Sequence, residues 1–125
     1  MHRSGLILFA HGARDPRWAL PFEAVAERVR ATHPGTAVRL AFLEFMAPDI
    51  AAAAAELATA GCDQVAVVPL FLGAGGHVRK DLPALLDTLR ERHAGVAFTL
   101  HPAVGETAVV IDAMATAAAQ ALGIR

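Results

Sequence analysis

Four apolar runs alternate along the chain with four segments whose apolar residues recur at helical spacing. The apolar runs cover residues 5–10, 37–44, 65–72 and 96–101. The helical segments lie near residues 20–32, 50–60, 82–93 and 106–122. Residues 65–72 are almost continuously apolar, which is typical of a parallel strand buried on both faces. This alternation with short connections predicts an α/β fold: an open four-stranded parallel sheet with helices on both faces and flavodoxin-like winding.

The composition limits the class of protein. Because 55% of the 125 residues are hydrophobic, we expect residues 1–125 to form a single α/β domain with its own core. The formal net charge of −1 argues against a general binder of nucleic acids. Cys62 is the only cysteine, which excludes an internal disulfide and fits a reducing cytoplasm. No apolar stretch reaches the ~20 residues of a membrane span, so we expect a cytoplasmic protein with no membrane partner.

Three residues that can bind metals or accept protons follow successive predicted strands. His11 follows the first strand, Glu44 ends the second and His77 follows the third. Open parallel sheets bind ligands beyond the carboxyl ends of their strands, so these side chains should meet at one edge. His101 ends the fourth strand at the same edge, but a His-Pro pair there is also a common turn, and we assign it a rim contact only.

The types of these side chains indicate their chemistry. Two imidazoles and a carboxylate suit a first-row divalent ion such as Co²⁺, Fe²⁺ or Ni²⁺ better than Mg²⁺ or Ca²⁺, which prefer oxygen ligands. The same groups can also accept protons. For Glu44 two structural alternatives stay open, since it could cap the following helix or pair with Arg14.

A glycine-rich segment precedes His77. Gly73, Gly75 and Gly76 are expected to adopt backbone conformations closed to other residues and to let a ligand approach the main chain. The segment lacks the last glycine of a G-x-G-x-x-G fingerprint and the G-K-[ST] of a P-loop, which argues against a dinucleotide or nucleotide triphosphate site.

Two motifs together carry a family resemblance. LILFAHGARDPR near the amino terminus and VVPLFLGAGGHVRKDLP at mid-chain resemble the small, single-domain sirohydrochlorin chelatases of the CbiX type, within the class II chelatase superfamily. The resemblance implies insertion of a divalent metal into sirohydrochlorin, with Co²⁺ in cobalamin synthesis, Fe²⁺ in siroheme synthesis and Ni²⁺ in some members. It implies that His11 and His77 handle the metal and that Glu44 is the acidic residue after the second strand. The metal would be a substrate, and no permanently bound cofactor is expected.

Cations next to the two motifs fit such a substrate. Sirohydrochlorin carries many carboxylates, and the candidate residues for binding them are Arg14, Arg79 and Lys80, with Glu44 and the three glycines completing the substrate site. Arg17 lies nearby as well, although an ordinary solvated charge would explain it equally.

Two rival functions need comparison. A histidine phosphatase has an arginine directly before the histidine that follows its first strand, and Ala10 occupies that position here. A non-catalytic metal or tetrapyrrole carrier could use the same residues, and turnover would separate it from a chelatase. Among metals we favour cobalt, because the short form resembles the cobaltochelatase branch.

The size of the chain also predicts its assembly. A domain of this length has a radius of gyration of ~14 Å, and one sheet edge offers only a shallow shelf to a broad tetrapyrrole. We therefore expect a homodimer about a two-fold axis, with His11, Glu44 and His77 of each copy on a shared cleft. Phe45, Met46 and residues 72–76 are the expected interface.

Overall fold

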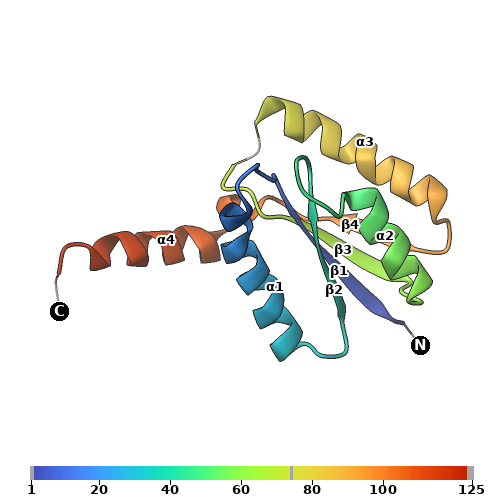
Figure 1. Cartoon of the computed structure of the whole chain (residues 1–125), viewed down its shortest axis with the longest axis horizontal. Helices are drawn as coiled ribbons and strands as arrows, with labels where there is room; N and C mark the ends of the chain where they lie inside the picture. The colour runs from blue at the N-terminus through green and yellow to red at the C-terminus, as the bar shows by residue number, and fades with distance from the viewer. Residues whose placement is uncertain (1, 74, 124–125) are drawn as a thin grey trace.

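The computed structural model describes residues 2–73 and 75–123 of the chain. Its centre is a four-stranded sheet in the order β2-β1-β3-β4, and every neighbouring pair is parallel. The strands are β1 (Ser4–Ala10), β2 (Ala37–Phe42), β3 (Gln64–Pro69) and β4 (Ala97–Leu100). The sheet predicted from the four apolar runs is thus confirmed, with the winding that reverses direction between β2 and β3 (Figure 1).

Helices flank both faces of this sheet. The helices are α1 (Leu20–Thr32), α2 (Ile50–Thr59), α3 (Gly76–Arg92) and α4 (Ala108–Gln120), with short 3-10 helices η1 (Pro16–Ala19) and η2 (Val104–Glu106). Figure 1 shows α1 on one side of the sheet and α2 with α3 on the other. Within the described ranges, no helix has both the length and the apolar character needed to cross a membrane.

Strand β1 is buried on both faces, as its continuous apolar run predicts. Phe9 packs with Leu57 of α2 and Leu86 of α3 in the larger core. On the opposite face Leu8 packs against Ala26 of α1. Burial of a large apolar side chain contributes roughly 1.5–3 kcal/mol, so the two cores hold β1 between the helix layers and fix the place where it ends.

Two predicted boundaries are wrong near the ends of β2 and β3. Strand β2 stops at Phe42, and the bend that follows includes Phe45, whose φ of 64° no strand residue adopts. Helix α3 starts at Gly76 and not near Leu82, because the N–H of Arg79 already donates to Gly75 at 3.0 Å. Gly75 caps the helix, Gly76 is its first residue and Pro83 lies in its interior.

The last helix differs most from expectation. Its alanine-rich sequence predicts a helix that packs closely on its neighbours. Helix α4 forms, but Figure 1 shows it extending away from the sheet, and none of its residues is buried.

Candidate active site at the carboxyl edge of the sheet

His11 and Glu44 lie side by side, as predicted from their positions after β1 and β2. The ladder between these strands continues past their ends, because Leu43 N–H donates to Ala10 at 2.9 Å and Glu44 N–H donates to His11 at 3.1 Å. Nε2 of His11 is 3.5 Å from Oε1 of Glu44, and the side chains are 51% and 49% exposed. The pair is therefore set by backbone pairing and remains open to an incoming ligand.

Gly12 allows the two loops to approach this closely. Its φ is 95°, in the left-handed region that favours glycine. A Cβ at this position would overlap the carbonyl oxygen of Glu44. The glycine of the His-Gly pair is thus required by geometry, and it holds the backbone of Glu44 against the loop that carries His11.

The ring of Phe71 contacts the imidazole of His11. The two ring centroids are 5.9 Å apart in an edge-on arrangement, and Phe71 also contacts Phe9 of the core at 6.0 Å. Phe71 itself is buried. The imidazole therefore rests on an apolar wall and turns one ring nitrogen toward Glu44.

A cavity of about 240 Å³ opens at this pair. His11, Glu44 and Asp81 supply its ionisable groups, and the rest of the wall is apolar: Phe9, Leu43, Val78, Leu82 and Leu85. Asp81 was missed at the sequence level, because α3 was expected to start one residue after it. The available signal was its spacing: Asp81 follows His77 by four residues, which places both on one side of a helix.

His77 itself is placed only in part. Its backbone belongs to the first turn of α3, so the expectation of a loop residue is wrong. Its side chain lies outside the described residues, and its meeting with His11 stays a prediction. Among the side chains that are described, no group of three His, Cys, Asp or Glu residues stands close enough to hold a metal ion.

The glycines at and just before the start of α3 differ from expectation. Gly73, Gly75 and Gly76 all lie outside the positive-φ region. A Cβ built on any of them meets no atom of the described residues within 4 Å. Their backbone conformations are therefore open to other residues.

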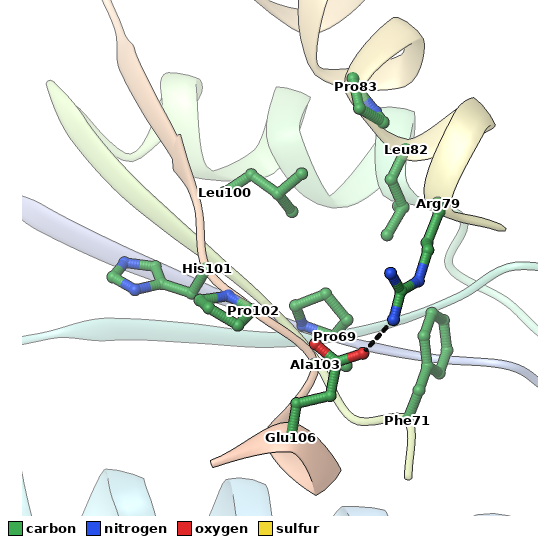
Figure 2. A pocket seen from close by; sticks show the side chains of 10 residues that line it. All are labelled: Pro69, Phe71, Arg79, Leu82, Pro83, Leu100, His101, Pro102, Ala103 and Glu106. Atoms are coloured by element: carbon green, nitrogen blue, oxygen red, sulfur yellow. Dashed lines mark hydrogen bonds and ion pairs between the residues drawn. The ribbon is translucent and has the colours of Figure 1, made fainter. Parts of the chain in front are cut away.

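A second cavity, of about 210 Å³, lies between α3, the end of β4 and η2 (Figure 2). Nη2 of Arg79 forms an ion pair with Oε1 of Glu106 at 2.9 Å across it. Leu82 lines this cavity and the one at His11, so the two are neighbours. Each is smaller than the roughly 300–1,000 Å³ of a typical small-molecule site.

The other cations considered for the site are Arg14, Lys80 and Arg17. Arg14 stacks its guanidinium over the ring of Phe45 at 4.7 Å, and Lys80 is exposed on α3. Arg17 binds Asp15 at 2.9 Å, and its side chain, followed by its backbone N–H, lowers the pKa of that carboxyl. The Arg17 side chain is 85% exposed, as an ordinary solvated charge would be, and its contact with substrate stays a prediction.

The structure decides whether Glu44 caps α2, and it places His101 directly after β4. Asp49, and not Glu44, caps α2 by accepting from the N–H of Ala52 at 2.8 Å. The N–H of His101 donates to Val67 at 2.9 Å, which extends the ladder of β3 and β4 by one step. Figure 2 shows the ring of His101 pointing away from Arg79.

Comparisons with known proteins show which chains this sequence and fold are similar to. The sirohydrochlorin cobaltochelatase of Methanosarcina acetivorans is 32% identical over 92 residues, which are 74% of this chain and 70% of that protein. A crystal structure of a CbiX protein of cobalamin (vitamin B12) biosynthesis from Marinobacter aquaeolei matches with a TM-score of 0.84 at 33% identity. That match covers 96% of this chain and 98% of the other.

A larger relative shares the fold. The sirohydrochlorin chelatase SirB of Bacillus subtilis, solved with cobalt, matches 80% of this chain with a TM-score of 0.72 at 23% identity. This chain spans 43% of that protein, less than half its length. The family model named CbiX matches residues 5–121, nearly the whole sequence. The chain therefore belongs to the CbiX family.

Proposed function

We propose that this protein inserts a divalent metal ion into sirohydrochlorin. The observation that carries the proposal is the contact between His11 and Glu44 beside an open cavity at the carboxyl edge of the sheet. The name of the Methanosarcina relative, a sirohydrochlorin cobaltochelatase, supports the same activity. In this reaction the metal and the tetrapyrrole are both substrates, and no resident cofactor is required.

The chemistry divides naturally among the residues of the site. Insertion forms four metal–nitrogen bonds, releases two protons from pyrrole N–H groups and transfers no electrons. Neutral His11 can replace a water on the incoming ion or accept a pyrrole proton, and Glu44 can accept the second proton or balance the charge of the ion. We assign His77 the same metal-handling role as His11, and Asp81 the role of drawing the cation into the cavity.

The carboxylates of sirohydrochlorin need cations at the rim. Arg14 follows β1, and Arg79 and Lys80 lie near the start of α3, shortly after Gly73, Gly75 and Gly76 in the sequence. Arg79 already binds Glu106, so a substrate carboxylate would exchange with that acidic side chain. Such an exchange would select for anionic substituents, because an apolar one could not compete for the guanidinium.

The finer assignments follow the relatives and the size of the cavities. Cobalt is the favoured metal because the Methanosarcina relative carries that name, with Fe²⁺ as the second candidate. We assign the enzyme to the cytoplasm and to cobalamin synthesis, with siroheme synthesis as the alternative. Two cavities of this size cannot enclose a tetrapyrrole, which supports a homodimer with a shared cleft.

Turnover is the decisive test. Purified protein is mixed with a large excess of sirohydrochlorin and Co²⁺, Fe²⁺ or Ni²⁺ in turn, and the absorption spectrum is followed against a protein-free control. We expect many equivalents of metallated product per chain, fastest with Co²⁺. Product that stops at one equivalent per chain would instead identify a carrier. The variant His77→Ala tests the metal-handling role of His77. An unchanged rate of metal insertion would show that His77 is not part of the site.

A further inference from the structure

Phe45 has a backbone conformation that its side chain disfavours. Its φ is 64°, and among the described residues it is the one non-glycine residue with a positive φ. The N–H of Met46 donates to the carbonyl of Glu44 at 2.8 Å, which closes a three-residue γ-turn centred on Phe45. Glycine or asparagine would adopt this conformation more readily than a bulky aromatic residue. Such an outlier points to a role for the side chain that the backbone alone does not explain.

Packing within the fold does not explain the choice of phenylalanine at this position. The side chain of Phe45 is 57% exposed, and it belongs to none of the core clusters of the described residues. The next residue, Met46, packs against the cluster formed by Ala10, Ala19 and Phe42. The turn therefore directs Met46 into the core and leaves the ring of Phe45 at the surface, where a ligand can reach it.

The turn is attached directly to the pair at the cavity. Glu44, the residue before Phe45, lies 3.5 Å from His11 through its side chain, and its N–H donates to the carbonyl of His11 at 3.1 Å. The N–H of Phe42 donates to the carbonyl of Pro48 at 2.9 Å and closes the base of the loop. Hydrogen bonds of the main chain thus fix the place of the Phe45 ring relative to His11 and Glu44.

Arg14 adds a positive charge to this ring. The carbon at the centre of its guanidinium lies 4.7 Å from the centroid of the Phe45 ring. Stacking uses a face of the guanidinium, whereas its N–H donors point outward in the plane, where a carboxylate can accept two hydrogen bonds. A flat apolar ring and a cation therefore stand side by side. This combination matches a conjugated macrocycle that carries carboxylates at its periphery.

We propose that Phe45 is a substrate-binding residue, whose ring packs against the macrocycle of the tetrapyrrole while Arg14 binds one of its peripheral carboxylates. The inference rests on the proposed function and adds to it a contact with the macrocycle itself. Aromatic rings attract each other in offset or edge-on arrangements, which an aliphatic side chain cannot reproduce. Because the turn joins Phe45 to Glu44, this contact would hold the pyrrole nitrogens near the groups that accept their protons.

Titration with metal-free sirohydrochlorin tests the contact without turnover, and the absorption and fluorescence of the tetrapyrrole follow binding. Phe45→Leu keeps an apolar side chain without the aromatic ring, and it should raise the dissociation constant by about 3- to 10-fold, the value of an aromatic pair. Phe45→Tyr keeps the ring and should change it by less than about twofold. Val25→Ala, at an exposed apolar position near the middle of α1, is the control and should bind as the parent does.

Two results of this titration would overturn the inference in different ways. Equal dissociation constants for Phe45→Leu and Phe45→Tyr would exclude the aromatic contact, while binding and turnover by the parent protein would leave the proposed function intact. A parent protein that binds no sirohydrochlorin would overturn the proposed function together with the inference.

The stability of a glycine variant separates a contact with substrate from a structural role. Phe45→Gly removes the ring and relieves the positive φ, so its urea unfolding midpoint should equal or exceed that of the parent. Its dissociation constant for sirohydrochlorin should nevertheless rise by about 10-fold or more, because the whole apolar contact is lost. A midpoint well below that of the parent would assign Phe45 to the fold. Unchanged binding of sirohydrochlorin with a weakened dimer in light scattering would assign it to a contact between copies.

Discussion

The Nε2 atom of His11 lies 3.5 Å from Oε1 of Glu44, a distance slightly beyond that of a strong hydrogen bond. The two groups are close enough to act on one metal ion or one proton, yet neither is saturated by the other. Backbone pairing between the ends of β1 and β2 and the contact of Gly12 with the Glu44 carbonyl hold them there. The site is thus preorganised by the main chain while the side chains stay accessible.

Replacing His11 with alanine should abolish catalysed insertion. The imidazole supplies either the ligand exchange or the proton transfer, and loss of a positioned acid–base group costs about 10²–10⁴-fold in rate. The initial rate of spectral change with sirohydrochlorin and Co²⁺ measures this, after subtraction of uncatalysed insertion. Far-UV circular dichroism should be unchanged, because the side chain is half exposed. His33→Ala is the control and should keep the parent rate, because His33 caps the C-terminal end of α1, away from this site.

The sequence predicts His11 and Glu44 well because both follow strands whose apolar character is unambiguous. Asp81 could not be found in the same way, since Gly75, Gly76 and Pro83 disguise the start of α3. The φ angles of Gly73, Gly75 and Gly76 could not be predicted either, because a glycine can adopt φ values of either sign. The periodicity of the sequence predicts that α4 is a helix. It does not predict the direction of α4, because that direction depends on tertiary contacts of Gly105 and Glu106 that leave no local sequence pattern.

Asp81→Asn should raise the KM for the metal ion more than the KM for the tetrapyrrole. Asp81 lines the cavity with His11 and Glu44, so its charge attracts the cation before insertion. We expect the KM for Co²⁺ to rise by about 3- to 10-fold, as for one nearby charge, with the KM for sirohydrochlorin unchanged. Asp87→Asn, on the same helix but bound to Arg90, is the matched control. Equal effects of the two variants would remove Asp81 from the site.

Gly12→Ala should destabilise the fold and the site together. The new Cβ would overlap the Glu44 carbonyl and would require φ near 95°. Alanine at a positive φ costs more than about 1 kcal/mol, and the overlap adds to this. Urea unfolding of Gly12→Ala and Gly35→Ala provides the comparison, since a Cβ on Gly35 meets no atom within 4 Å in the part of the chain that the structure describes. Similar unfolding midpoints for the two would contradict the role of Gly12.

The N-terminal segment should loosen in acid. Asp63 binds the ring of His2 at 2.9 Å and accepts from the Arg3 N–H at 2.9 Å, and the His2 contact is the main cause that lowers the pKa of Asp63. Because the pKa of Asp63 is lower in the folded protein than in the unfolded chain, its contacts with His2 and Arg3 stabilise the fold above the unfolded pKa of about 3.9. This stabilisation is lost as the pH falls through the folded pKa. Carboxyl carbon NMR of Asp63 follows this titration. In His2→Ala the midpoint should move up toward the ordinary value, and an unmoved midpoint would assign the shift elsewhere.

Glu106→Gln should improve the binding of sirohydrochlorin. Glu106 holds Arg79 by an ion pair that a substrate carboxylate must displace, and both side chains are more than one third exposed. An exposed pair of this kind is worth roughly 0.2–1 kcal/mol, which corresponds to a KM for sirohydrochlorin lowered by about 1.4- to 5-fold with kcat unchanged. Added salt should shrink the difference, because it screens the competition between the two carboxylates. Glu56→Gln is the matched control, since Glu56 pairs with Arg39 at 3.2 Å in a different pair of elements, α2 and β2. If Glu106→Gln raised the KM instead, Glu106 would contribute to substrate binding itself, and the exchange of carboxylates at Arg79 would be wrong.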